Sequence, residues 1–219
     1  ERLAVVGETG AGKSTIAKLA ARFYDPQAGT ITIDGIDIRA LRFDALRSAV
    51  AMVPQEGFLF TGSVRDNIAY ARSDMADDEI WEVARVLGIE DWLRSLPERL
   101  DTEVRERGMR LSSGERQLVS LARAMAADPA VIVLDEATSN LDPETEATVE
   151  EALGRLLAGR TAIVIAHRLQ TAQRADRILV VSDGSIAEQG TFDELLERGG
   201  AFARLQTVWE TAEDLERTE

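Results

Sequence analysis

The chain has 219 residues, of which 45% are hydrophobic, so it can bury a sizeable core as one large domain or as a core with an insertion. Its formal net charge of -14 argues against a nucleic-acid surface, because phosphate backbones demand clustered Lys and Arg. The absence of cysteine excludes a disulfide framework, a thiol nucleophile and a zinc–thiolate site.

The first predicted element is an apolar strand, Leu3–Val6, which leads into a glycine-rich turn and then into a helical pattern over Lys13–Phe23. Glycines let the turn fold back so that consecutive backbone N–H groups point at one anion, and the helix adds the positive end of its dipole. Lys13 would reach the β- and γ-phosphates, and the Ser14 hydroxyl would complete the shell of a Mg²⁺ ion. The pattern therefore predicts a nucleotide-binding phosphate loop. Its expected contacts are Gly7, Glu8, Thr9, Gly10, Ala11, Gly12, Lys13, Ser14 and Thr15.

Three later apolar runs resemble the first, since each is followed closely by a residue of chemical interest. They are Val50–Val53 before Gln55, Val131–Leu134 before Asp135 and Glu136, and Thr161–Ala166 before His167. Unalternated runs of this kind are typical of strands buried on both faces, and so of a parallel sheet. Ligands of open α/β sheets bind beyond the carboxyl ends of the strands. We therefore expect these polar residues to meet the phosphate loop around one pocket. The intervening helical patterns are Phe43–Ala49, Ser113–Ala127 and Glu144–Leu157.

The stretch from about Phe58 to Ala127 contains no clear strand. Its helical patterns over Ala76–Leu87 and Ile89–Ser95 predict an inserted all-helical subdomain. Upstream of it, Thr30–Asp34 reads as a short strand that ends in a glycine turn.

The end of the chain predicts a hairpin of two strands, Arg177–Val181 and Ser185–Glu188. Phe192–Glu197 and Ala201–Trp209 have short amphipathic helical patterns. Residues 210–219 are polar, and we expect them to fray.

The two acids after the third apolar run suit phosphoryl chemistry. Asp135 can hold the Mg²⁺ shell, directly or through water, and Glu136 can polarise the attacking water. A lone histidine after a buried strand is more often a packing or capping residue than a catalytic one. The neighbouring strands, which end in Gln55 and the two acids, favour contact of His167 with the γ-phosphate.

Leu111–Glu115 opens the helix predicted to end at Ala127, and Ser112 or Ser113 is a natural N-cap, so a simple capped helix is one interpretation. The segment also resembles LSGGQ, the signature of the nucleotide-binding domain of ABC transporters, and it lies ahead of the Asp-Glu strand as in that family. Other family elements follow the same order. Gln55 resembles the Q-loop glutamine, Ser139–Asp142 the D-loop and His167 the switch histidine, and the resemblance extends from Glu1 to about Trp209.

This resemblance implies an α/β fold, a P-loop NTPase (RecA-like) core with a mainly parallel sheet and an inserted α-helical subdomain. The implied boundaries are residues 1–57 for the first part of the core, 58–128 for the subdomain with the signature, and 129–219 for the second part of the core. ATP and Mg²⁺ are the implied cofactors. The implied catalytic residues are Glu136, His167 and Gln55. The implied metal-binding residues are Ser14, Gln55 and Asp135. Further nucleotide-binding residues would be Ser112, Ser113, Gly114 and Asp142, with the signature acting on the nucleotide of an opposite subunit.

Val53–Ile68 is similar to the Q-loop region of exporters, and Thr102–Gly108 to the loop that touches their transmembrane domain. For the second stretch, a solvated charged loop is the alternative. The resemblance implies an ATPase at the cytoplasmic face of the cell membrane, which powers transport of an unknown substrate through a transmembrane partner, without nucleic acid. The chain itself should be soluble, since its apolar runs are far shorter than the ~20 residues of a membrane-spanning helix. A soluble ABC ATPase acting on DNA or ribosomes, and a module that binds nucleotide without turnover, are the alternatives.

The signature departs from the family pattern at Ser113, where glycine is preferred, and at Glu115, where glutamine is preferred. A carboxylate in the first turn stabilises its own helix but opposes an approaching polyanion. This combination resembles one half of a heterodimeric exporter, with a homodimer as the alternative. The aromatic residue that stacks on adenine in the family would lie upstream of this chain.

Overall fold

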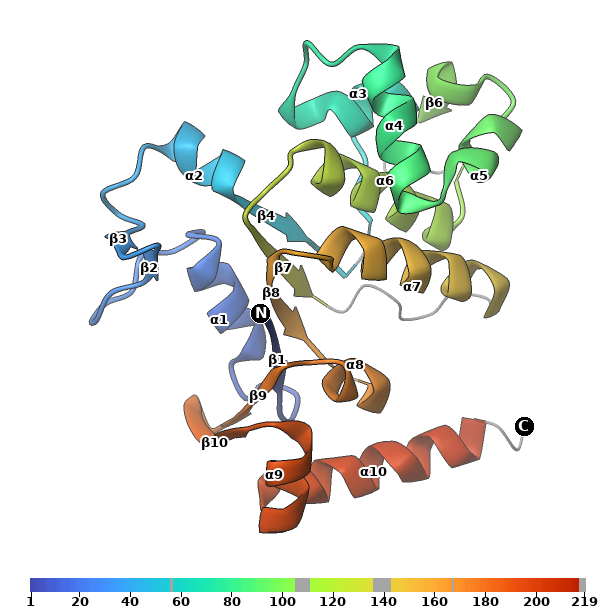
Figure 1. Ribbon diagram of the computed structural model, residues 1–219. Helices are drawn as coiled ribbons and strands as arrows, with labels where there is room; N and C mark the ends of the chain where they lie inside the picture. The colour runs from blue at the N-terminus through green and yellow to red at the C-terminus, as the bar shows by residue number, and fades with distance from the viewer. Residues whose placement is uncertain (56, 105–110, 136–142, 167, 217–219) are drawn as a thin grey trace. The chain divides into compact units, whose positions relative to one another are not determined.

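The computed structural model describes residues 1–55, 57–104, 111–135, 143–166 and 168–216, and they divide into two units (Figure 1). The first unit contains Glu1–Ala40, the end of strand β7 (Val131–Asp135) and the chain from Arg160 onward. The second contains Leu41–Ile132 and helix α7 (Pro143–Leu157). Within the described ranges, no helix combines the length and the apolar character needed to cross a lipid bilayer. The boundaries predicted at 57/58 and 128/129 stay predictions.

Strand β1 (Arg2–Val6) is the centre of the sheet in the first unit. It pairs in parallel with β8 (Thr161–Ile165) on one side and with β9 (Arg177–Ser182) on the other. Strand β10 (Ser185–Gly190) returns antiparallel to β9. The mainly parallel sheet and the terminal hairpin predicted from the sequence are confirmed.

Successive side chains of β1 point to opposite faces of the sheet, and different helices cover the two faces. Val5 belongs to a cluster that packs against Ile16 of α1, whereas Ala4 belongs to one that contains Phe202 of α10. These three side chains of β1 and α10 are fully buried, which explains why the run in β1 does not alternate. The helices of this unit are α1 (Lys13–Ala20), α8 (Leu169–Gln173), α9 (Phe192–Arg198) and α10 (Ala201–Glu216), and its small hairpin consists of β2 (Thr32–Ile33) and β3 (Ile36–Asp37).

Helix α6 (Ser113–Ala126) is the centre of the second unit, where it contacts α3, α4, α7 and β4 (Figure 1). Its buried side chains include Leu118 and Leu121, which are at most 2% exposed. Around it lie α2 (Phe43–Ala49), β4 (Val50–Val53), α3 (Val64–Ile68), the 3-10 turn Ala69–Ala71, α4 (Asp77–Leu87), α5 (Glu90–Ser95) and the 3-10 turn Arg99–Asp101. The predicted helices of this region are confirmed within a few residues of their ends.

The expectation of no strand between Phe58 and Ala127 was wrong. Strands β5 (Gly62–Ser63) and β6 (Glu103–Val104) form a two-residue antiparallel ladder. Each strand of this ladder has only two residues, which is too short for an alternating pattern that a sequence window could detect. The two strands also lie 40 residues apart in the sequence, so no local hairpin signal connects them.

The last helix is longer than predicted, because α10 continues past Trp209 to Glu216, while the fraying expected for residues 210–219 stays a prediction. The Nε2 of Gln206 donates to the Oε1 of Glu210 at 2.6 Å, and the hydroxyl of Thr211 donates to the carbonyl of Thr207 at 2.8 Å. The contact between the side chains of Gln206 and Glu210, four residues apart, stabilises a helix that its polar composition alone would not predict.

A buried amide and a guanidinium fix the irregular segment before α3. Asn67 is 1% exposed, and its side chain accepts from the backbone N–H of Phe60 and donates to the carbonyls of Phe60 and Ser63. Arg123 of α6 donates to the carbonyl of Asn67 at 2.9 Å, to its Oδ1 at 2.6 Å and to the carbonyl of Phe58 at 2.9 Å. This network attaches the segment that follows β4 to the central helix.

Glu188 of β10 holds the start of α10, and this contact gives a stability prediction. Its carboxylate accepts from the backbone N–H groups of Ala201 at 2.7 Å and Phe202 at 3.1 Å. Since these groups have no acceptor within the helix, Glu188→Ala should lower the free energy of unfolding by about 1–2 kcal/mol in denaturant titrations. The control is Gln189→Ala at the neighbouring exposed position, with an expected effect within about 0.5 kcal/mol. Equal effects of the two substitutions would refute this role of Glu188.

Candidate functional site

The glycine-rich turn between β1 and α1 is shaped by close backbone packing. Gly7 has φ +147°, and a Cβ atom at this position would lie 2.1 Å from the carbonyl oxygen of Val181 in β9. The N–H of Ala11 donates to the carbonyl of Glu8 at 3.2 Å, and the N–H of Gly184 donates to the carbonyl of Ala11 at 3.1 Å. The hairpin β9–β10 thus packs directly against the loop, and only glycine fits at position 7.

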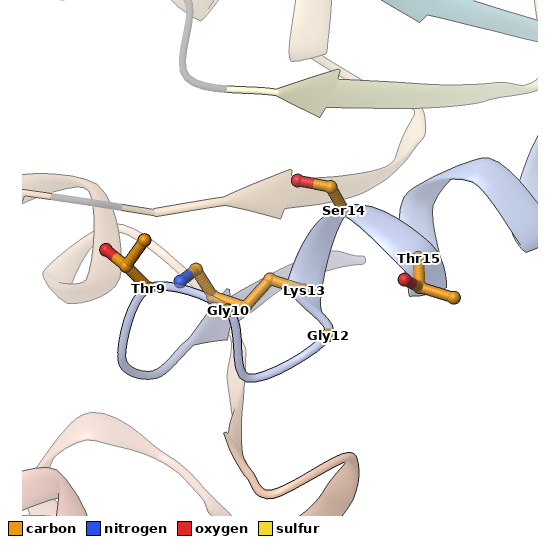
Figure 2. Close-up of a pocket in the computed structure, with 6 residues that line it drawn as sticks. All are labelled: Thr9, Gly10, Gly12, Lys13, Ser14 and Thr15. Atoms are coloured by element: carbon orange, nitrogen blue, oxygen red, sulfur yellow. The ribbon is translucent and has the colours of Figure 1, made fainter.

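The start of α1 is suited to bind an anion. Gly12 is its N-cap in a left-handed conformation, no side chain among the described residues caps it, and its first turn contains no acid. The first N–H groups of a helix have no acceptor within it, and the helix dipole adds positive potential there. These groups face a cavity of about 230 Å³ lined by Thr9, Gly10, Gly12, Lys13, Ser14 and Thr15 (Figure 2).

Lys13 adds a buried positive charge to this cavity. It is 6% exposed, and its ammonium donates to the carbonyls of Gly7 at 2.7 Å and Glu8 at 2.9 Å. Figure 2 shows the side chain turning back along the loop toward Thr9 and Gly10. Carbonyl dipoles compensate an ammonium only in part, so an anion of several negative charges would bind favourably beside it.

Of the other predicted site residues, the structure describes some and not others, and those described lie in both units. Asp135 is the half-buried last residue of β7, in the same unit as the phosphate loop, and Gln55 is exposed after β4 in the other unit. Glu136, His167 and Asp142 lie outside the described residues. The prediction that all of these meet in one pocket therefore stays a prediction.

Mg²⁺ prefers a few hard oxygen ligands and keeps several waters or phosphate oxygens in its shell. The first unit offers the hydroxyl of Ser14 beside the cavity and the carboxylate of Asp135 at the end of β7. These donors suit that ion chemically.

The signature segment forms the start of α6, with a complete capping box. The hydroxyl of Ser112 accepts from the N–H of Glu115 at 3.2 Å, and the Glu115 carboxylate accepts from the N–H of Ser112 at 2.7 Å. Ser113 is exposed, whereas Gly114 is buried. The expected N-cap is confirmed at Ser112.

Sequence reasoning missed one partner of this segment. The indole N–H of Trp92 in α5 donates to the second oxygen of Glu115 at 3.2 Å. The spacing of Ser112 and Glu115 is itself a local capping-box signal. No local signal connects Glu115 with Trp92, because 23 residues separate them.

Comparison with known proteins places the chain among close relatives. A family model described as ABC transporter matches residues 1–139. The Bacillus subtilis ABC transporter ATP-binding protein YknV is 49% identical over 203 residues, which cover 93% of this chain and 34% of that protein. Human ATP-binding cassette sub-family B member 6 is 45% identical over 218 residues, which cover 100% of this chain and 26% of that protein.

A solved structure of a bacterial Atm1-family ABC exporter with ATP bound has a TM-score of 0.86 and 44% sequence identity. The similarity covers 94% of this chain and 36% of that one. The chain spans about a third of the length of the bacterial relatives it matches.

The contact between Gly7 and Val181 predicts different tolerance at two glycines of the loop. Gly7→Ala should lower the free energy of unfolding by about 3 kcal/mol or more, since a Cβ at Gly7 would displace a strand backbone. Gly10→Ala, at φ +85° with open space around it, should cost only about 1–2 kcal/mol from backbone strain. Denaturant titrations of both variants test this. If Gly7→Ala were the better tolerated, the packing argument would fail.

Proposed function

The chain belongs to the ABC transporter family, and from this membership we propose that it works as the ATP-hydrolysing motor of an exporter, with Lys13 and the start of α1 binding the phosphates of ATP. ATP binding and hydrolysis are the established activity of ABC ATP-binding domains. One observation supports the assignment of ATP binding to these particular residues. The uncapped start of α1, the buried ammonium of Lys13 and the close packing of Gly7 form one anion-binding loop.

We assign the remaining steps of hydrolysis as follows. Ser14, Gln55 and Asp135 would hold Mg²⁺, and the ion would supply positive charge to the phosphate oxygens. Glu136 accepts a proton from the water whose oxygen attacks the γ-phosphorus, and the bond from that phosphorus to the oxygen of ADP breaks. His167 contacts the γ-phosphate. The products are ADP and inorganic phosphate.

A second nucleotide-binding domain completes the site. Ser112, Ser113 and Gly114 approach the γ-phosphate held by the opposite domain, and Asp142 lies at the same dimer contact. In an α-helix the N–H groups of the first two positions, here Ser113 and Gly114, have no acceptor within the helix and can bind phosphate. The exposed Ser113 adds bulk where close backbone approach is required, and this supports a heterodimer slightly over a homodimer.

The transmembrane part belongs to the same proposal. Relatives extend to about three times the length of this chain, and the solved Atm1-family structure is that of an exporter. We place this domain at the cytoplasmic face of a membrane, where it drives transport of a substrate that the transmembrane part selects. The net charge of -14 supports this function over one on nucleic acid.

Two substitutions separate catalysis from binding. Glu136→Gln should retain MgATP binding but lower the ATP turnover rate by about 100-fold or more, because the water loses its proton acceptor. Lys13→Ala should instead weaken nucleotide binding, because the cavity loses its cation. Turnover assays and titration with a fluorescent ATP analogue distinguish the two results. A Glu136→Gln variant with wild-type turnover in an assembled dimer would contradict the role of Glu136.

Assembly should depend on ATP. The chain should sediment as a monomer without nucleotide, and Glu136→Gln with MgATP should form a dimer, because an unhydrolysed γ-phosphate bridges the two domains. Adding the Lys13→Ala substitution should abolish that dimer. A dimer of equal strength with and without ATP would refute this mode of assembly.

A further inference from the structure

Glu115 has its two carboxylate oxygens engaged in different directions. One oxygen accepts from the backbone N–H of Ser112 at 2.7 Å, and the other accepts from the indole N–H of Trp92 at 3.2 Å. The first contact lies at the N-terminus of the signature helix, where the helix dipole favours a negative charge. The second comes from a different helix, α5 (Figure 1). The carboxylate is therefore fixed from two sides.

Helix α5 is firmly attached, so it can fix the position of Glu115. Leu93 is fully buried and Ile89 is 1% exposed on either side of Trp92 in the sequence, and the Ser95 hydroxyl donates to the carbonyl of Trp92 at 2.6 Å. Trp92 itself is half-buried, and indole nitrogen can only donate. Its hydrogen bond to Glu115 is therefore a directed contact from a rigid element.

Arg116, the residue after Glu115, also holds the first turn of α6. Its guanidinium donates to the carbonyl of Leu111 at 2.7 Å. A Cβ at Gly57 would lie 2.7 Å from the backbone carbon of Arg116, so the chain after β4 packs directly on this turn. The signature turn thus has supports on several sides, and the Trp92 contact adds a donor from another helix to the one that Ser112 gives the carboxylate of Glu115.

We propose that Trp92 is a positioning residue for the signature, which holds the charge of Glu115 against its own helix and away from the nucleotide of the opposite domain. This inference rests on the proposed function of the signature. The capping box uses the N–H groups of Ser112 and Glu115, so those of Ser113 and Gly114 stay available for phosphate. With Trp92 in place, a carboxylate at position 115 supports the helix start and repels ATP less than a carboxylate free to turn toward it.

A purely structural role would give a different result. If the Trp92 contact only stabilised the fold, its loss would lower the free energy of unfolding but leave the affinity of the folded domains for each other unchanged. A positioning role changes the ATP-dependent dimerisation of the folded protein. It also requires the carboxylate, because the amide of a glutamine carries no charge to be held away from phosphate.

The test is a double-mutant cycle in the Glu136→Gln chain with saturating MgATP, measured by sedimentation well below the unfolding temperature. Trp92→Phe should weaken the dimer about 10-fold or more when residue 115 is Glu, as expected from the loss of a hydrogen bond to a charged group. In the Glu115→Gln background the same substitution should change the dimerisation constant by less than about 2-fold. Nucleotide affinity of the monomer should be unchanged throughout, since the phosphate loop lies in the other unit.

The matched control is Trp81→Phe in α4 of the same unit, where the ring contacts the guanidinium of Arg94 at 4.5 Å. It should leave the dimer unchanged. An equal effect of Trp92→Phe in both backgrounds, or an equal effect of Trp81→Phe, would overturn the positioning role alone. Absence of any ATP-dependent dimer of the parent Glu136→Gln chain, both alone and mixed with a nucleotide-binding domain that carries an unmodified LSGGQ signature, would overturn the proposed function, and this inference with it.

Discussion

Unsatisfied backbone N–H groups at helix starts are the constraint on which this chain depends. Every α-helix begins with N–H groups that have no acceptor within the helix, and burial makes such groups costly. At α10 the carboxylate of Glu188 supplies the acceptor, and at α6 Ser112 and Glu115 supply it. At α1 the N-cap is Gly12, which has no side chain to supply one. Of these three helix starts, the one without a side-chain acceptor lies beside the Lys13 cavity, where an anionic ligand can supply the acceptor.

The shape of the phosphate loop depends on a strand that is far away in the sequence. Because Gly7 has no Cβ, the carbonyl oxygen of Val181 can occupy the place that a Cβ would take, and the N–H of Gly184 donates to the carbonyl of Ala11. The hairpin β9–β10 is itself joined to α10 through Glu188. The C-terminal elements therefore support the loop, whereas the described residues that line its cavity are those of the loop and of α1.

Local patterns predicted the parts of the fold that local forces decide. The buried run of β1, the glycine turn and the capping position Ser112 depend on neighbours within a few residues, and each was found where the sequence placed it. Contacts over long separations had no such signal. The indole of Trp92 reaches Glu115 over 23 residues, and Arg123 reaches Asn67 over 56. For Glu115 the two cases meet: its capping role has a local signal in its spacing from Ser112, whereas its contact with Trp92 has none.

In the second unit, contacts with the backbone join two functional segments, the segment that follows β4 and the start of α6. Gly57 packs so closely on Arg116 that no Cβ fits, and Arg123 holds the carbonyl of Phe58 at 2.9 Å. Gln55 stands just before this attachment, and Ser112 stands just before Arg116. A displacement of the chain after β4 must therefore either break the Arg123 hydrogen bonds or carry α6 with it. Several hydrogen bonds from a half-buried guanidinium are costly to break together, so movement of the two segments together is the path of lower free energy.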